Sequence, residues 1–338
     1  MDNISSYFSS FFNTPEEKSL FMSKLSLTSE EICDNSINSN YEVINSAFNA
    51  LLNIKSDAFK IEVNRNATAI IDLLFKKYVT ADTFVIYALE HTSIIKNIEN
   101  VEYKCMFART MLDNFNIEYF LEKYKESGCK KVFVYAAGVI QNKVVYQTFY
   151  EKLKERFISE NIPVVFVLDD VQTMFIVPRD YTIFDHIIFT CHSILPCYDL
   201  GVVLSKQISN LGSTDLRYLE DFIEIYKKII TKNLNNLQLF NFIITDYLSE
   251  LLQNKEISIS TQSPHNIVYI TINDKVVKDF IQKHIEKLEK YKIDFGEDTF
   301  LIKANFILQC EPHEIIEGLE LLKQLLQKGI KLKKQRSI

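Results

Sequence analysis

The segment Phe189-Thr190-Cys191-His192-Ser193-Ile194-Leu195-Pro196 is followed by Leu200-Gly201-Val202-Val203-Leu204, so a short polar turn joins two apolar runs. These runs, at 186–189 and 200–204, are rich in β-branched and aromatic residues. Continuous runs of this kind are typical of strands that are buried on both faces of a mostly parallel sheet. The segment therefore predicts two strands with a polar turn between them.

The same alternation extends upstream. Stretches with the length and periodicity of crossover helices, at 112–127 and 144–160, separate further strand-like runs. Those runs lie at 83–87, 131–135 and 163–168. The pattern predicts an α/β fold, with helices that flank a mostly parallel sheet of about seven strands.

The pattern changes after residue 204. A long helical periodicity at 214–254 leads into a strand-helix-strand-helix order, at 266–272, 275–291, 300–306 and 312–328. This order predicts a small C-terminal α/β domain. We expect three parts: an N-terminal helical segment (1–45), a large domain (46–210), and a linking helix with the small domain (211–338).

Composition limits the class of protein. The 338 residues are 47% apolar and carry a net charge of −6, with both signs interspersed, which argues against nucleic acid as a partner. No run has the length of a membrane span, and the start of the chain lacks the features of a signal peptide, so we expect a cytoplasmic protein. The six cysteines are dispersed, which predicts reduced thiols and no metal site. We expect the basic cluster at 331–336 to be a solvated tail.

The segment around Ser193 resembles the active-site segment of class V (fold type I) pyridoxal-phosphate enzymes, a family that includes cysteine desulfurases and molybdenum-cofactor sulfurases. In that family a hydroxyl residue, any residue, His and Lys precede a glycine-containing turn into an apolar strand. Thr190 and His192 match this pattern, and Ser193 stands where the family has lysine. A serine hydroxyl cannot form the covalent bond that anchors the cofactor. The resemblance therefore implies the fold and cofactor contacts from Thr190 and His192, without the catalytic lysine.

Two upstream segments also resemble the family. The stretch Asn64-Arg65-Asn66-Ala67-Thr68-Ala69 is similar to the phosphate-binding turn at a helix N-terminus, where Thr68 would contact the phosphate. The alternative is an ordinary capped helix. The stretch Glu90-His91-Thr92-Ser93 is similar to the segment whose histidine stacks on the cofactor ring, which assigns that role to His91.

Asp169-Asp170-Val171-Gln172 resembles the family's Asp-x-x-Gln. There the aspartate pairs with the protonated ring nitrogen and the glutamine meets the ring oxygen, so the resemblance assigns Asp169 and Gln172 to the cofactor. A carboxylate beside the ring keeps the pyridinium charged. The alternative is that Asp169 or Asp170 caps the turn after a strand.

Two departures concern the substrate side of the site. Lys303 takes the place of the family's carboxylate-binding arginine, although its single compact charge does not replace a two-pronged guanidinium. A surface lysine is the alternative. Residues 291–299 contain no cysteine, and the desulfurases need one on this loop. We expect Lys206 to be out of reach of the missing amine's position, and Lys143 and Lys96 to lie on helices or loops outside the ring pocket.

The resemblance spans roughly residues 40–326 and leaves three interpretations. The first is a degenerate, non-catalytic homologue of aminotransferase and desulfurase-type enzymes, acting as a scaffold or regulatory subunit. Because the family's active sites form between two subunits, it implies a homodimer or a heterodimer with an active paralogue. The second is a lysine-independent enzyme that binds pyridoxal or pyridoxamine phosphate non-covalently and acts on an amino acid or amino sugar. The third keeps the fold but fills the pocket with side chains such as Met174 and Tyr198.

Overall fold

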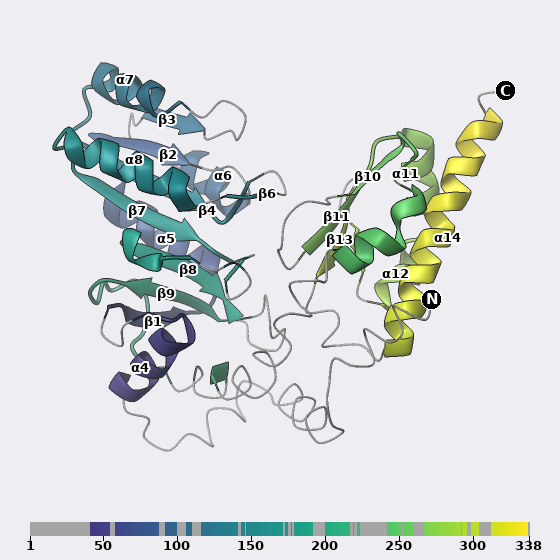
Figure 1. The fold of residues 1–338 in the computed structure, drawn as a ribbon, viewed down its shortest axis with the longest axis horizontal. Helices are drawn as coiled ribbons and strands as arrows, with labels where there is room; N and C mark the ends of the chain where they lie inside the picture. The colour runs from purple at the N-terminus through teal and green to yellow at the C-terminus, as the bar shows by residue number, and fades with distance from the viewer. Residues whose placement is uncertain are drawn as a thin grey trace. The chain divides into compact units, whose positions relative to one another are not determined.

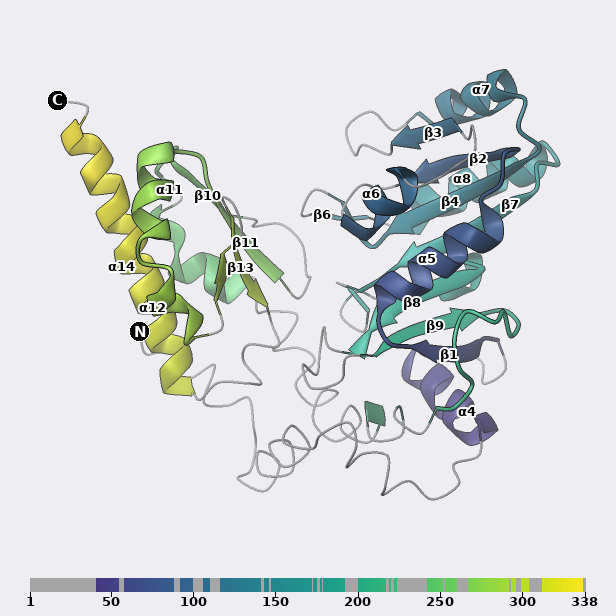
Figure 2. The ribbon, with the colours of Figure 1, turned by 180° about the vertical axis from the view of Figure 1, so that it is seen from behind.

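The computed structural model describes most of the chain from residue 41 onward (Figures 1 and 2). The described residues are 41–54, 58–87, 92–99, 106–109, 116–140, 143–145, 147–171, 173–174, 177, 179–191, 200–216, 219, 222–223, 242–251, 253–259, 267–291, 293–295, 299–303 and 312–336. Those up to 223 belong to one compact unit and those from 242 onward to another. Most of the predicted N-terminal segment, and residues 224–241 of the predicted linking helix, lie outside the described residues.

The first unit is built on a seven-stranded sheet with the order β1-β9-β8-β7-β4-β2-β3 (Figure 1). The five strands β3, β2, β4, β7 and β8 are parallel, whereas β9 is antiparallel to both of its neighbours. The strands are β1 (Lys60–Asn64), β2 (Thr83–Tyr87), β3 (Met106–Arg109), β4 (Lys131–Ala137), β7 (Val164–Asp169), β8 (His186–Thr190) and β9 (Gly201–Ser205). This sheet confirms the predicted fold class.

Helices cover both faces of this sheet. Figure 2 shows α5 (Ala67–Tyr78) and α6 (Thr92–Glu99) in front of it, and Figure 1 shows α7 (Ile117–Ser127) and α8 (Gln147–Ser159) in front of the opposite face. Ile70, Ile71, Leu74 and Phe75 of α5 pack on alternate residues of the central strands, among them Tyr135, Val167, Ile188 and Val203. These strand residues define what we call the α5 face. Helix α4 (Tyr41–Leu51) lies beside β1, because Tyr41 donates a hydrogen bond to the Ile61 carbonyl of β1 and Asn45 donates one to the carbonyl of Phe59, just before the strand.

The strands β2, β4, β7 and β8 end at one edge of the sheet, which we call the carboxyl edge. A hairpin of β5 (Val139–Ile140) and β6 (Lys143–Val144) follows β4 directly and lies next to this edge. A 3₁₀ helix (Tyr181–Ile183) leads into the opposite, amino end of β8. Because ligands of open α/β sheets bind beside the carboxyl ends of the strands, the carboxyl edge is the place to look for a site.

The second unit contains an antiparallel sheet with the order β10-β11-β13-β12. Its labelled helices are α11 (Lys275–Gln282), α12 (Glu286–Glu289) and α14 (Pro312–Arg336), with a 3₁₀ turn at Ser249–Leu251. Residues 242–247, within the predicted helical stretch 214–254, are also helical. Its strands are β10 (Ile257–Ile259), β11 (Ile267–Ile272), β12 (Asp294–Phe295) and β13 (Thr299–Lys303). The predicted helix at 275–291 is in fact two helices, α11 and α12.

The basic cluster at 331–336 was predicted as a solvated tail; it is mostly exposed, but it is helical. It forms the last turns of α14, and the Nζ atom of Lys333 lies 3.0 Å from Glu256 Oε1 and 2.9 Å from Asp274 Oδ2. Glu256 precedes β10, and Asp274 caps α11. The helix therefore continues past its predicted end at residue 328, and Lys333 ties its last turns to both elements. Among the described residues, no helix has the length and apolar character needed to cross a membrane.

Candidate functional site

Asp169 is the last residue of β7 and lies at the carboxyl edge. Its Oδ2 atom accepts a hydrogen bond of 2.7 Å from the Tyr135 hydroxyl, and its Oδ1 atom accepts one of 3.2 Å from the Val171 amide. Side chains alternate along a strand, so Asp169 shares the α5 face with Val167. Two donors therefore orient the carboxylate that the sequence assigned to a cofactor.

Tyr135 lies on β4 and is 1% exposed. Burial raises the pKa of its hydroxyl well above the usual 10, and the charge of Asp169 raises it further. The hydroxyl therefore stays protonated and remains a donor to Asp169. The sequence pattern identified this tyrosine only as part of a buried strand.

The first turn of α5 begins at the same edge. Asn66 caps the helix, and its side chain accepts a hydrogen bond of 2.9 Å from the Ala69 amide. A Cβ atom at Gly201 would lie 2.2 Å from the Asn66 carbonyl carbon, so only glycine allows β9 to start against this turn. Gly201 pairs with Thr190, the last residue of β8, which places the helix start beside the end of that strand.

Three predicted site residues have described side chains, and all three lie at this edge. Thr68 is in the first turn of α5, Asp169 ends β7, and Thr190 ends β8. Thr190 is buried and shares the α5 face with Ile188, which pairs with Asp169. Their role in cofactor binding stays a prediction.

The side chains of the remaining predicted site residues lie outside the described part of the chain. His91, Gln172, His192 and Ser193 lie outside the described residues, as does Tyr198. Lys303 is the last residue of β13 in the second unit, but its side chain is outside the described part.

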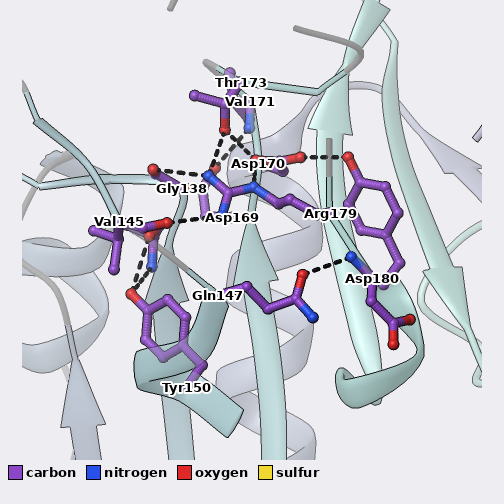
Figure 3. A network of polar contacts seen from close by, with 12 residues as sticks. Gly138, Val145, Gln147, Tyr150, Asp169, Asp170, Val171, Thr173, Arg179 and Asp180 are labelled. Carbon is purple, nitrogen blue, oxygen red and sulfur yellow. Dashed lines mark hydrogen bonds and ion pairs between the residues drawn. The ribbon is translucent and has the colours of Figure 1, made fainter. Parts of the chain in front are cut away.

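A buried ion pair fixes the turn after β7 (Figure 3). The Nε atom of Arg179 lies 3.3 Å from Asp170 Oδ1, and both side chains are almost completely buried. Asp170 also accepts hydrogen bonds from the hydroxyls of Thr173 and Tyr181. Burial raises the pKa of Asp170, while Arg179 and the two hydroxyls oppose that rise. Asp170 is therefore the anchor of a buried network rather than a simple turn cap.

Arg179 connects this turn to the hairpin after β4. It donates hydrogen bonds of 2.8 Å to the Val145 carbonyl and 3.0 Å to the Gly138 carbonyl (Figure 3). A Cβ atom at Gly138 would lie 2.4 Å from the Thr173 hydroxyl oxygen and 2.5 Å from Asp170 Oδ1. The network therefore holds together the two segments that flank Asp169. No local pattern predicted Arg179, because it follows Asp170 only after an irregular segment.

The sequence predicted that three lysines, at positions 206, 96 and 143, lie away from the ring pocket. Lys206 follows β9, and its Nζ atom lies 3.1 Å from Asp185 Oδ1, just before β8 starts, which is the edge opposite Asp169. Lys96 is exposed in the last turn of α6. Lys143 lies on β6, so it is on a hairpin strand at the carboxyl edge rather than on a helix or loop. Its side chain is outside the described part of the chain.

A second polar network lies at the opposite edge of the sheet. The ring of His186 is hydrogen-bonded through Nδ1 to the Ser205 hydroxyl and through Nε2 to the Tyr78 hydroxyl, each at 2.8 Å. Ser205 contacts Ser209, which donates to the buried carboxylate of Glu62. Burial lowers the pKa of His186 from 6.5 to about 4. This network therefore joins α5, β1, β8 and β9.

Known proteins with a similar structure share this architecture. No family model matches the chain, and no curated protein matches it in sequence. A NifS-like protein from Rickettsia africae ESF-5 has a similar structure, with a TM-score of 0.66 and 14% identity over 96% of this chain and 98% of that one. A C-DES mutant with glycine covalently linked to its pyridoxal phosphate cofactor has a TM-score of 0.64 and 14% identity, over 90% and 92% of the two chains.

The α-aminoadipate aminotransferase LysN from Thermus thermophilus is also similar, with a TM-score of 0.58 and 13% identity over 94% of this chain and 90% of that one. The chain has the fold of fold-type-I pyridoxal-phosphate enzymes. This likeness concerns the fold alone, because the identities are low.

The described residues of this fold-type-I chain fit such a cofactor in two respects. A carboxylate, Asp169, is available for a protonated ring nitrogen, and the start of α5 with the Thr68 hydroxyl is available for a phosphate. Both lie at the carboxyl edge, and Asp169 lies on the face that α5 covers. Within the described ranges, no group of three or more His, Cys, Asp and Glu side chains could hold a metal ion.

Proposed function

We propose that this chain binds pyridoxal phosphate without a covalent bond and acts as a non-catalytic scaffold or regulatory subunit. The observation that carries the proposal is Ser193. It follows β8 by three residues and takes the place of the lysine in a segment that otherwise resembles the family's. Without an amine there, the chain cannot anchor the cofactor or exchange it with an amino substrate in the usual way.

Two features support retained binding of the cofactor. Tyr135 and the Val171 amide hold Asp169 at the end of β7, where it would stabilise a positively charged ring nitrogen. The α5 start offers Thr68 and backbone amide dipoles to a phosphate, which helix N-termini favour. When bound, pyridoxal phosphate supplies an electron sink for chemistry at an amino group.

A protein of this fold can hold the cofactor after a lysine is removed. The C-DES mutant carries alanine in place of a lysine, and it retains pyridoxal phosphate covalently linked to glycine. We infer that Ser193 in this chain is compatible with a cofactor held by its phosphate and ring contacts alone.

A lysine-independent enzyme is the second candidate, and the Asp169–Tyr135 pair is the observation that favours it. A carboxylate held beside the ring nitrogen keeps the pyridinium charged, and chemistry at an amino group needs that charge. In that case the protein would bind pyridoxal or pyridoxamine phosphate and act on an amino acid or amino sugar, with His192 or Ser193 moving the proton.

Equilibrium dialysis of the purified chain with pyridoxal phosphate tests the binding part. We expect saturable binding to one site per chain, and weaker binding by Asp169→Asn and Thr68→Val. The exposed variant Lys96→Gln serves as the control, because Lys96 is in α6 and should not affect the site. Equal, non-saturable uptake by all four proteins would contradict the proposal and would favour a pocket filled by side chains.

Amino-acid turnover distinguishes the two candidates. We expect no transamination, decarboxylation or desulfuration above that of buffer with cofactor, because loss of a catalytic nucleophile lowers rates by about 10³-fold or more. Turnover that survives removal of contaminating enzymes, and that Asp169→Asn abolishes, would favour the lysine-independent enzyme.

Subunit organisation is a further part of the proposal. We propose a homodimer or a heterodimer with an active paralogue, because active sites of the family form between two subunits. Light scattering of the purified chain tests the homodimer. A strictly monomeric chain would exclude it and leave the heterodimer, which requires co-expression with a lysine-containing paralogue.

A further inference from the structure

The hydroxyl of Tyr135 donates a hydrogen bond of 2.7 Å to the Asp169 carboxylate. We propose that Tyr135 is a positioning residue whose hydroxyl fixes the Asp169 carboxylate. The protein then binds a cofactor with a protonatable ring nitrogen more tightly than one without it. This inference rests on the proposed binding of pyridoxal phosphate and adds a residue that sets its specificity.

The position of the tyrosine hydroxyl is fixed by packing. Tyr135 is 1% exposed, and its ring lies 6.1 Å from that of Phe75 on α5, within the cluster that joins α5 to the sheet. Because burial raises the pKa of the hydroxyl, it does not ionise near neutral pH and cannot repel the carboxylate. The donor therefore stays in one place and in one protonation state.

Asp169, by contrast, is only partly buried. An exposed carboxylate would turn freely and would be shared with water. Here Tyr135 donates to one oxygen and the Val171 amide to the other, so both oxygens are held. Hydrogen bonds to charged groups are about twice as strong as neutral ones, which makes the Tyr135 contact an effective restraint.

A purely structural role does not account for the hydroxyl. Phenylalanine would fill the same volume in the α5 cluster, so packing alone requires the ring and not the oxygen. The oxygen has Asp169 as its partner, and Asp169 lies on the face where α5 starts. The pair therefore belongs to the carboxyl edge.

Tyr150 provides a matched control. It is also 1% exposed, and its hydroxyl donates to the Ala137 carbonyl at 3.0 Å and accepts from the Ala137 amide at 3.2 Å. The variant Tyr150→Phe removes a buried phenol hydroxyl at the same end of β4 but leaves the contact between Tyr135 and Asp169 unchanged. Both variants should be checked for thermal unfolding before the ligand experiments.

The test compares two ligands by equilibrium dialysis. One is pyridoxal phosphate, and the other is an analogue with a C–H group in place of the ring nitrogen. We expect the wild type to prefer pyridoxal phosphate by roughly tenfold or more, the size of one hydrogen bond to a charged group. Tyr135→Phe should lose most of this preference, as Asp169→Asn should, while Tyr150→Phe retains it.

Each result has one meaning. If Tyr135→Phe keeps the wild-type preference, the positioning role is wrong although the cofactor binds. If the wild type binds both ligands equally, Asp169 does not meet the ring nitrogen and the inference fails with it. If the wild type binds neither ligand, the proposed function fails first. Loss of binding of both ligands to the same extent in Tyr135→Phe would show a structural role and would also overturn the inference.

Discussion

Arg179→Met is expected to destabilise the chain strongly. The change removes one partner of the buried ion pair with Asp170 and leaves the carbonyls of Gly138 and Val145 without this donor. Breaking a buried pair in this way costs about 3–5 kcal/mol, because it leaves an uncompensated buried charge. For a unit of this size, each kcal/mol lowers Tm by about 2–4 °C, so the expected fall is about 6–20 °C.

A double-mutant cycle makes the test specific. Asp170→Asn combined with Arg179→Met should be less destabilised than the sum of the single variants, because the second change removes the orphaned charge. Thermal and urea unfolding, followed by circular dichroism, measure all four proteins. Arg156→Met is the control, since Arg156 pairs with Glu118 and Glu160 at the surface and its loss should leave Tm almost unchanged. A loss below about 1 kcal/mol for Arg179→Met, or strict additivity in the cycle, would refute the reasoning.

Three further predictions follow from single residues. His186 has a pKa of about 4 in the folded chain and near 6.5 in the unfolded chain. Its contribution to the free energy of unfolding is therefore complete above pH 6.5 and falls by about 3 kcal/mol as the pH drops to 4. Urea unfolding across this pH range should show the fall, and His186→Gln should remove most of it. Gly201→Ala would place a Cβ atom 2.2 Å from the Asn66 backbone, so it should lower Tm and weaken pyridoxal phosphate binding. Unchanged binding would argue against the α5 start as the phosphate site. Ser193→Lys should acquire a borohydride-reducible bond to pyridoxal phosphate, detected as added mass, and a variant that binds the cofactor but gains no such bond would show that position 193 is not the lysine position.

Strands that are buried on both faces were predictable from the sequence. The runs that became β2, β4, β7, β8 and β9 are continuous and apolar, so their pattern does not depend on distant partners. Strand β1 was not predicted because it contains Glu62, which is buried and accepts hydrogen bonds from the amides of Ser209 and Leu211. These partners are about 150 residues away, and no local pattern indicates them.

The candidate site was predictable only as far as motifs extend. Asp169 was identified from its spacing to Gln172 and from its position after a strand. Tyr135 and Arg179 were not identified. Tyr135 meets Asp169 only because β4 pairs with β7, and Arg179 meets Asp170 only after an irregular segment. The end of α14 shows the same limit, since Lys333 pairs with Glu256 and Asp274 from other elements.

The central claim is that this chain holds pyridoxal phosphate without a covalent bond to one of its lysines. Borohydride reduction of the cofactor-saturated protein, followed by peptide mass spectrometry, tests it most directly. We predict that the bound cofactor is released on denaturation and that no single lysine is labelled in proportion to the occupied site. Stoichiometric labelling of one lysine, for example Lys143 at the carboxyl edge, would contradict the claim and identify a relocated amine.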